Sequence, residues 1–268
     1  MPQYSASLYS HMVSYTVIIL CLASFGAGFV DSIVGGGGLI QLPALMMVLP
    51  QYSVVTLLGT NKLVSVTGTA FSAYRFSSHV PFIRSLIIPA ILSAFLFSFL
   101  GAYTVSIVSN EFLKPFFMIL LFCVFLLTIR NKMFGLVDHD PNVIIPLWKP
   151  IAIGSVLGFY DGFFGPGTGT FLIIAFVGLL GMTFVQGSAY AKIINLTTNL
   201  AAILLFMFKG TFLFQYALPM MVFNVLGAVV GVRLALLKGN TFVRGLLRII
   251  VLSTILKLGY QIIREYLI

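Results

Sequence analysis

Long apolar stretches separated by short polar or glycine-rich breaks run along almost the whole chain. Most of these stretches reach the ~18–20 residues that an α-helix needs to cross a bilayer. The stretches at 39–49 and 170–180 are only about half as long as that, and each follows a glycine-rich run. The pattern predicts helices at 13–33, 39–49, 53–77, 83–108 and 112–130, and again at 149–164, 170–180, 183–208, 213–237 and 241–264.

The second series of helices repeats the first at a constant offset of 130 residues. Residues 28–42 read GFVDSIVGGGGLIQL and residues 158–172 read GFYDGFFGPGTGTFL, with six identities in fifteen positions, where composition alone gives about one or two. The same register pairs Lys62 with Lys192. We therefore predict an internal duplication within one membrane domain, with the domain at 1–268, the repeats at 13–130 and 149–264, and a polar linker at 131–148.

The two short stretches determine the predicted topology. The eleven residues at 39–49 rise only about 16 Å as a helix, roughly half of the hydrocarbon core. Non-helical backbone at membrane depth must be covered by protein or line a water-filled cavity, so we interpret 18–49 and 149–180 as re-entrant or broken-helix hairpins. Each half then has one hairpin and three full crossings, which gives about eight spans and up to ten helical segments in all. Because the number of crossings per half is odd, the second half is inverted relative to the first.

The charges favour this inversion over parallel halves with four crossings each. Inversion places seven basic residues on one side and three on the other, and the richer side is then cytoplasmic by the positive-inside rule. Both chain termini then face the periplasm.

Composition supports an all-α membrane protein rather than a soluble one. Sixty per cent of the residues are hydrophobic and 8% are charged, whereas soluble domains carry about 25% charged residues. The net charge of +9 is spread over scattered residues, which is typical of topology signals and not of a nucleic-acid interface. The cysteines and histidines are too dispersed for a metal site, and we expect no metal and no cofactor.

The two glycine-rich runs are the first candidates for chemistry. We expect Leu39 and Thr170 to begin short helices after them, and a helix N-terminus with free N–H groups attracts anions. Neither run fits a nucleotide-binding loop. The alternative is that glycine merely permits close helix packing at these places.

Lys62 and Lys192 lie inside predicted membrane helices, where a cation is costly and is by default a functional candidate. The alternative is that each lysine snorkels to the membrane interface. Neutral hydrogen-bonding side chains follow nearby, including Thr197 and Thr198. The candidate substrate-binding residues are Gly35, Gly36, Gly37, Gly38, Asn61, Lys62, Thr67, Gly165, Gly167, Thr168, Gly169, Lys192, Asn195 and Asn199.

Asp31 and Asp161 are the only acids within the predicted apolar helices. A buried carboxylate can carry a proton, or it can neutralise Lys62 and Lys192. It can also cap the glycine loop through backbone N–H groups. The sequence leaves all three roles open.

At these residues the chain resembles the sulfite exporter TauE/SafE family, also called the toluene sulfonate uptake permeases. The resemblance rests on GFVDSIVGGGGLIQLPAL at 28–45 with TNKL at 60–63, and on GFYDGFFGPGTGTF at 158–171 with AKIINLTTN at 191–199. It implies a multi-pass permease of the bacterial inner membrane whose substrates are small sulfur-containing anions. The second motif has Pro166 and Thr168 where the first has Gly36 and Gly38, so we expect an asymmetric site.

The leading hypothesis is a secondary carrier of a sulfur oxyanion that works by alternating access and is coupled to a proton. An anion channel with the same site is the alternative. A membrane-embedded enzyme is a weaker alternative, because the chain has no HExxH and no GxSxG motif. The expected partners are a small anion, a coupled proton and membrane lipid, with no nucleic acid and with a homodimer as one candidate assembly.

Overall fold

The computed structural model describes residues 2–113, 116 and 145–238, and all structural statements below refer to these residues. Most of the predicted helix at 112–130, all of the predicted helix at 241–264 and most of the linker at 131–148 lie outside them. The described helices are α1 (Pro2–Val34), α2 (Gly38–Val48), α3 (Val54–Ser77), α4 (Arg84–Ile107), α6 (Trp148–Phe163), α7 (Thr168–Leu180), α8 (Phe184–Phe208) and a further helix at Phe214–Lys238.

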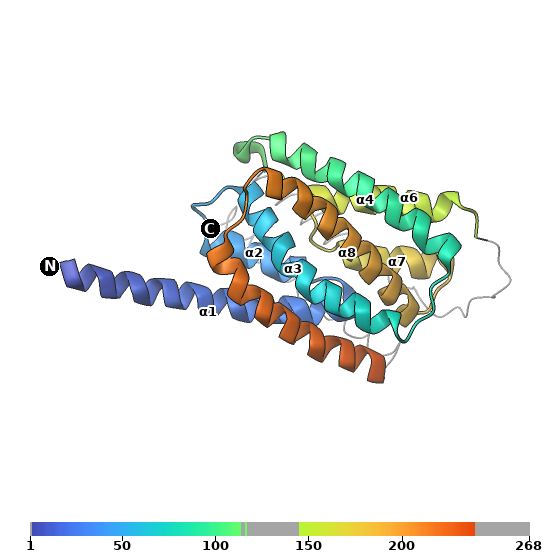
Figure 1. Cartoon of the computed structure of the whole chain (residues 1–268), viewed down its shortest axis with the longest axis horizontal. Coiled ribbons are helices and arrows are strands. Elements are labelled where there is room, and N and C mark those ends of the chain that lie inside the picture. Colours follow the sequence, from blue (N-terminus) through green and yellow to red (C-terminus); the bar gives the residue numbers. More distant parts are fainter. Residues whose placement is uncertain (1, 114–115, 117–144, 239–268) are drawn as a thin grey trace, which may run out of the picture.

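The described part is all-helical, as predicted, and most helix ends agree with the apolar pattern to within about two residues. The start of α1 is wrong in the prediction, which placed it at residue 13. The polar residues that precede this point contain no helix breaker after Pro2, and proline is tolerated in the first turn of a helix. α1 therefore extends well beyond the rest of the bundle (Figure 1).

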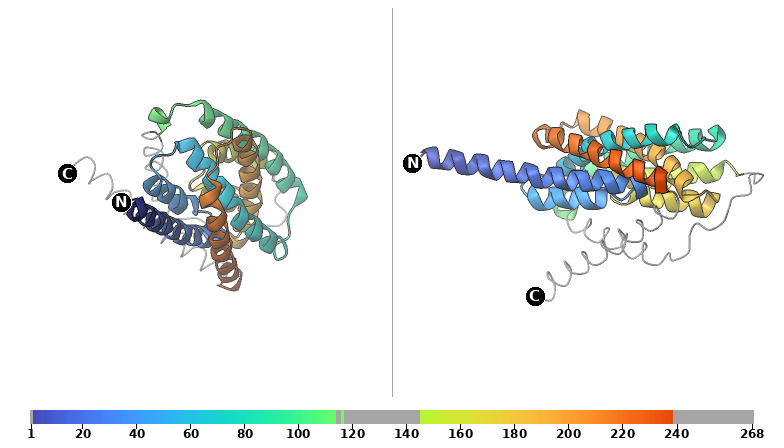
Figure 2. Two further views of the ribbon diagram at one scale, coloured as in Figure 1. Left: turned by 60° about the vertical axis from the view of Figure 1, so that its left-hand side comes forward. Right: turned by 90° about the horizontal axis from the view of Figure 1, so that it is seen from below.

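Two short helices, α2 and α7, lie among longer ones (Figures 1 and 2). The prediction began them at Leu39 and Thr170, and both begin slightly earlier, at Gly38 and Thr168. Within the described residues, four helices are long and apolar enough to cross a membrane: Tyr15–Val34, Arg84–Ile107, Phe184–Phe208 and Phe214–Lys238.

α3 has the length of a span but is not among these four helices, because it is less apolar than they are. Its polar residues Thr60, Asn61 and Lys62 are buried, and α3 packs against α8. α3 and α8 thus carry the predicted lysines inside the protein rather than toward lipid.

Glycines allow the outer helices to approach each other closely. α6 packs along α4, and a Cβ atom on Gly158 would lie 2.7 Å from the backbone oxygen of Ala94. At the offset of 130, a Cβ atom on Gly28 of α1 would lie 2.1 Å from the backbone oxygen of Asn224. The two repeats therefore use the same kind of close helix contact at equivalent positions.

Candidate functional site

The first buried ion pair joins Lys62 of α3 to Asp161 at the end of α6. Lys62 Nζ donates to Asp161 Oδ2 at 2.5 Å, and both side chains are buried. Asp161 is the third residue from the C-terminal end of α6, just before the second glycine loop. This placement makes the interface explanation for Lys62 wrong, because its ammonium group is held inside the protein.

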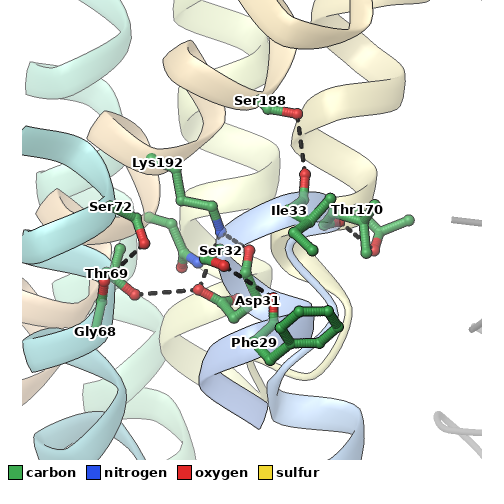
Figure 3. Close-up of polar contacts among 12 residues, drawn as sticks. Phe29, Asp31, Ser32, Ile33, Gly68, Thr69, Ser72, Thr170, Ser188 and Lys192 are labelled. Carbon is green, nitrogen blue, oxygen red and sulfur yellow. Dashed lines mark hydrogen bonds and ion pairs between the residues drawn. The ribbon is translucent and has the colours of Figure 1, made fainter. Parts of the chain in front are cut away.

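The second ion pair joins Lys192 of α8 to Asp31 of α1 (Figure 3). Lys192 Nζ donates to Asp31 Oδ2 at 3.0 Å and also to the backbone oxygen of Asp31. Thr69 Oγ1 of α3 donates to the same Oδ2 at 3.3 Å. Lys192 is fully buried, whereas the Asp31 side chain is 15% exposed. The Lys192–Asp31 pair is therefore less completely enclosed by protein than the Lys62–Asp161 pair.

The two ion pairs are crossed between the repeats. Asp31 and Asp161 are 130 residues apart, as are Lys62 and Lys192, and each lysine binds the aspartate of the other repeat. Of the three roles that the sequence leaves open for the aspartates, the structure shows neutralisation of the lysines. In the described part of the chain, no hydrogen bond from a loop N–H group to either carboxylate is found.

A second crossed contact recurs at the same offset. The backbone N–H of Ile83 donates to Tyr190 Oη at 2.6 Å, and the backbone N–H of Leu213 donates to Thr60 Oγ1 at 3.1 Å. Tyr190 and Thr60 are 130 residues apart, as are Ile83 and Leu213. The accepting hydroxyl group thus belongs to a tyrosine in one contact and to a threonine in the other, while the position of the contact in the repeat is the same.

The glycine loops meet each other at backbone level. Gly35, with φ +76°, lies against Gly169, and a Cβ atom on Gly35 would come within 2.2 Å of the Gly169 carbonyl carbon. Only glycine adopts this φ without strain and leaves room for the second backbone. Thr170 Oγ1 donates to the Val34 backbone oxygen at 2.9 Å and holds the two loops together.

The second loop also touches an ion pair. A Cβ atom on Gly165 would lie 3.1 Å from Lys62 Nζ, and Gly165 has φ +95°. In the first loop, Gly37 lies against the Asp31 side chain. The packing explanation for the glycines therefore holds at Gly35 and Gly169, while Gly37 and Gly165 border the charged groups.

The remaining predicted residues divide into two sets. The side chains of Asn61, Asn195 and Asn199 are buried within α3 and α8. The hydroxyl groups of Thr67, Thr168 and Thr197 each donate to a backbone oxygen three or four residues earlier, so these threonines are not joined to the ion pairs by their hydroxyls. Gly36, Gly38 and Gly167 complete the loops, with Gly38 against Pro166.

Sequence reasoning missed a set of neutral polar residues beside the ion pairs. They are Ser24, Gln41, Thr69 and Asn224, all buried. The repeat comparison did not find Ser24, Gln41 and Asn224, because the equivalent positions are Gly154, Phe171 and Ala94. Thr69 was missed although its equivalent, Asn199, is polar and was among the predicted residues. The available signal was an amide side chain inside an otherwise apolar helix.

The site as a whole carries no net charge from its ion pairs. Two ammonium groups face two carboxylates. The nearby loops and the N-termini of α2 and α7 add only partial positive charge. Each ammonium group is thus already neutralised by a carboxylate.

Comparison with known proteins identifies relatives over most of the chain. A family model described as "Sulfite exporter TauE/SafE" matches residues 20–258. The probable membrane transporter protein ORF9 of Sinorhizobium sp is 35% identical over 247 residues, which cover 91% of this chain and 92% of the relative.

Two further relatives have similar names. The probable membrane transporter protein of Haemophilus influenzae is 33% identical over 251 residues, covering 93% of this chain and 96% of the relative. The probable membrane transporter protein YfcA of Escherichia coli K12 is 35% identical over 249 residues, covering 91% and 89%. No solved structure matches the chain.

Proposed function

Because the chain belongs to the sulfite exporter TauE/SafE family of membrane transporters, we propose that it is a secondary carrier of small anions that works by alternating access. The observation that carries this proposal is the crossed arrangement of Lys62–Asp161 and Lys192–Asp31 beside two touching glycine loops. The proposed substrates are sulfite, organosulfonates or related sulfur oxyanions. The proposed location is the bacterial inner membrane.

The proposed architecture is a pair of inverted repeats. α1 and α6 are equivalent at the offset of 130, and they run in opposite directions (Figure 1). The crossed ion pairs and the two crossed backbone contacts support a twofold relation between the repeats. Inverted repeats with broken helices at a midplane site are a recurrent design of secondary transporters.

Binding of an anion is proposed to follow protonation of one carboxylate. When Asp31 accepts a proton, its attraction for Lys192 falls and the ammonium group becomes available to the anion. A monoanion and one proton then enter together, and the charge of the site is unchanged. This couples anion movement to proton movement without any further ionisable group.

Asp31 is the proposed first proton acceptor because its side chain is 15% exposed, while that of Asp161 is 1% exposed. The twofold relation between the repeats supplies a second state in which these exposures are exchanged. Asp161 and Lys62 would then face the opposite side of the membrane. The contact between Gly35 and Gly169 supports a carrier rather than an open channel, because protein occupies the place where the loops meet.

Anion binding to the purified protein tests this proposal. We expect ethanesulfonate, whose charge is constant across the accessible pH range, to bind more tightly as the pH falls and to take up a proton as it binds. In Asp31→Asn, binding should lose most of this pH dependence, because Lys192 is no longer held by a carboxylate.

Lys192→Met is the matched loss-of-function variant, and Thr104→Val on the exposed face of α4 is the control. We expect Lys192→Met to abolish binding and Thr104→Val to leave it unchanged. If Lys192→Met bound sulfite, ethanesulfonate, thiosulfate and propionate as tightly as the unmodified protein, the proposed site would be wrong.

A further inference from the structure

A buried network of neutral polar side chains adjoins the Asp31 side of the site. Asn224 Nδ2 donates to Gln41 Oε1 at 3.1 Å and to the Ser24 backbone oxygen at 3.2 Å. Ser24 Oγ donates to the Met220 backbone oxygen at 2.8 Å. The network therefore adds hydrogen bonds to the apolar packing between α1, α2 and the helix Phe214–Lys238.

The fold itself does not require polar residues at these places. At the offset of 130, the positions of Ser24 and Gln41 are occupied by Gly154 and Phe171, and the position of Asn224 by Ala94. Phe171 is packed against the ring of Tyr160 with centroids 5.6 Å apart. One repeat thus builds the same helix contacts without amide side chains, whereas the buried amides of Gln41 and Asn224 in the other repeat are hydrogen-bonded within the protein.

The network is close to the exposed carboxylate of the site. A Cβ atom on Gly68 would lie 2.1 Å from Asn224 Oδ1, and the next residue, Thr69, donates to Asp31. Gly28 of α1, which touches the Asn224 backbone, is three residues before Asp31. Gly28 and Gly68, which contact Asn224, therefore each lie within one helical turn of Asp31 or of the residue that donates to it.

Asn61 supplies an unused hydrogen-bond acceptor next to this network. Gln41 Nε2 donates to the Asn61 backbone oxygen at 3.3 Å, which ties the network to α3. The Asn61 side chain is 3% exposed, and its Oδ1 has no hydrogen-bond partner among the described residues. Buried polar atoms are normally satisfied, and an orphan acceptor in a native protein is a position where a ligand donor fits.

We propose that Asn61, with Gln41 and Asn224 behind it, forms a subsite for an N–H or O–H group on the transported anion. This inference rests on the proposed function and narrows its substrate class. The anion would be a small sulfonate or related oxyanion that also bears a hydroxyl or amino group. Its charged end would bind at Lys192, and its donor would bind at Asn61 Oδ1.

A matched set of anions tests the subsite. The probes are 2-hydroxyethanesulfonate, ethanesulfonate and 1-propanesulfonate, where the last two lack the donor and bracket the size of the first. Binding to the purified full-length protein should favour the hydroxylated anion by about tenfold or more, because an analogue without the donor leaves the buried acceptor unpaired.

The residue at the equivalent position of the second repeat suggests the first variant. Ala191 stands where the first repeat has Asn61, so Asn61→Ala is the principal variant and Asn61→Leu is a second one of similar volume. We expect both variants to lose the preference for the hydroxylated anion, measured within each variant as the ratio of its affinities for 2-hydroxyethanesulfonate and ethanesulfonate. Thr104→Val should retain it.

The outcomes separate the two proposals. If the unmodified protein binds all three sulfonates equally well, or if Asn61→Ala and Asn61→Leu keep the preference, the subsite is overturned while the anion carrier stands. If none of the three sulfonates binds, both the subsite and the proposed sulfonate specificity are overturned.

Discussion

The crossed ion pairs make a prediction that a double-mutant cycle can measure. Lys62→Met leaves the buried Asp161 carboxylate without its cation, and Asp161→Asn leaves the buried Lys62 ammonium without its anion. Removing one partner of a buried pair destabilises a protein by about 3–5 kcal/mol, whereas replacing both is often close to neutral. We therefore expect the double variant to be about as stable as either single variant, or more stable.

The magnitude of the coupling follows from these values. Two independent losses of about 3–5 kcal/mol would sum to about 6–10 kcal/mol. The double variant should instead lose no more than either single variant, about 3–5 kcal/mol, which gives a coupling of at least about 3 kcal/mol. The same result is expected for Lys192→Met with Asp31→Asn.

Within-repeat combinations serve as the controls. Lys62→Met with Asp31→Asn, and Lys192→Met with Asp161→Asn, combine residues that do not share a hydrogen bond. Their coupling should be smaller than that of the crossed combinations, because Lys62 and Asp31 interact only through space. The assay is reversible unfolding in mixed micelles with an increasing denaturing-detergent fraction, followed by helical circular dichroism. A larger coupling in the within-repeat combinations than in the crossed ones would refute this pairing.

Three further predictions concern the loops, the recurring contacts and the topology. Gly35→Ala should destabilise the protein by at least about 2 kcal/mol in the same unfolding assay, because a Cβ at φ +76° would be strained and would meet Gly169. Gly26→Ala has no atom within 4 Å of its new Cβ and should be neutral or slightly stabilising; equal losses in the two variants would contradict the loop contact. Tyr190→Phe and Thr60→Val each remove one of the recurring hydrogen bonds and should each lower the free energy of unfolding by about 0.5–1.5 kcal/mol, and no loss in either would argue against these bonds. With inverted repeats, a membrane-impermeant maleimide added to intact cells should label Lys209→Cys and not Ser78→Cys, and labelling of both from the same side would indicate parallel repeats.

The element order and the charged residues of the site were predictable because both leave strong local signals. Uninterrupted apolar stretches give the helices, and the offset of 130 identified Asp31, Asp161, Lys62 and Lys192 together. A lysine far inside an apolar stretch is rare enough to mark a site without any structure. Whether each lysine is buried or reaches the membrane interface could not be predicted from the sequence, and the structure shows both to be buried.

The pairing within the site was not predictable from the sequence. The repeat comparison relates Lys62 to Lys192, and it gives no information on which aspartate each lysine contacts. The crossed ion pairs join α3 to α6 and α8 to α1, and these are contacts between segments that are distant in the sequence. The network of Ser24, Gln41 and Asn224 was missed for a different reason, because it occurs in only one repeat.

The central claim is that Lys192 and Asp31 bind and couple an anion and a proton, and flux into proteoliposomes tests it most directly. Labelled ethanesulfonate uptake and internal pH should be followed together for the unmodified protein, Asp31→Asn and Lys192→Met. The account predicts saturable uptake with proton entry in the unmodified protein, loss of proton entry in Asp31→Asn, and loss of uptake in Lys192→Met. Uptake that does not saturate, or that is unchanged in Lys192→Met, would contradict it.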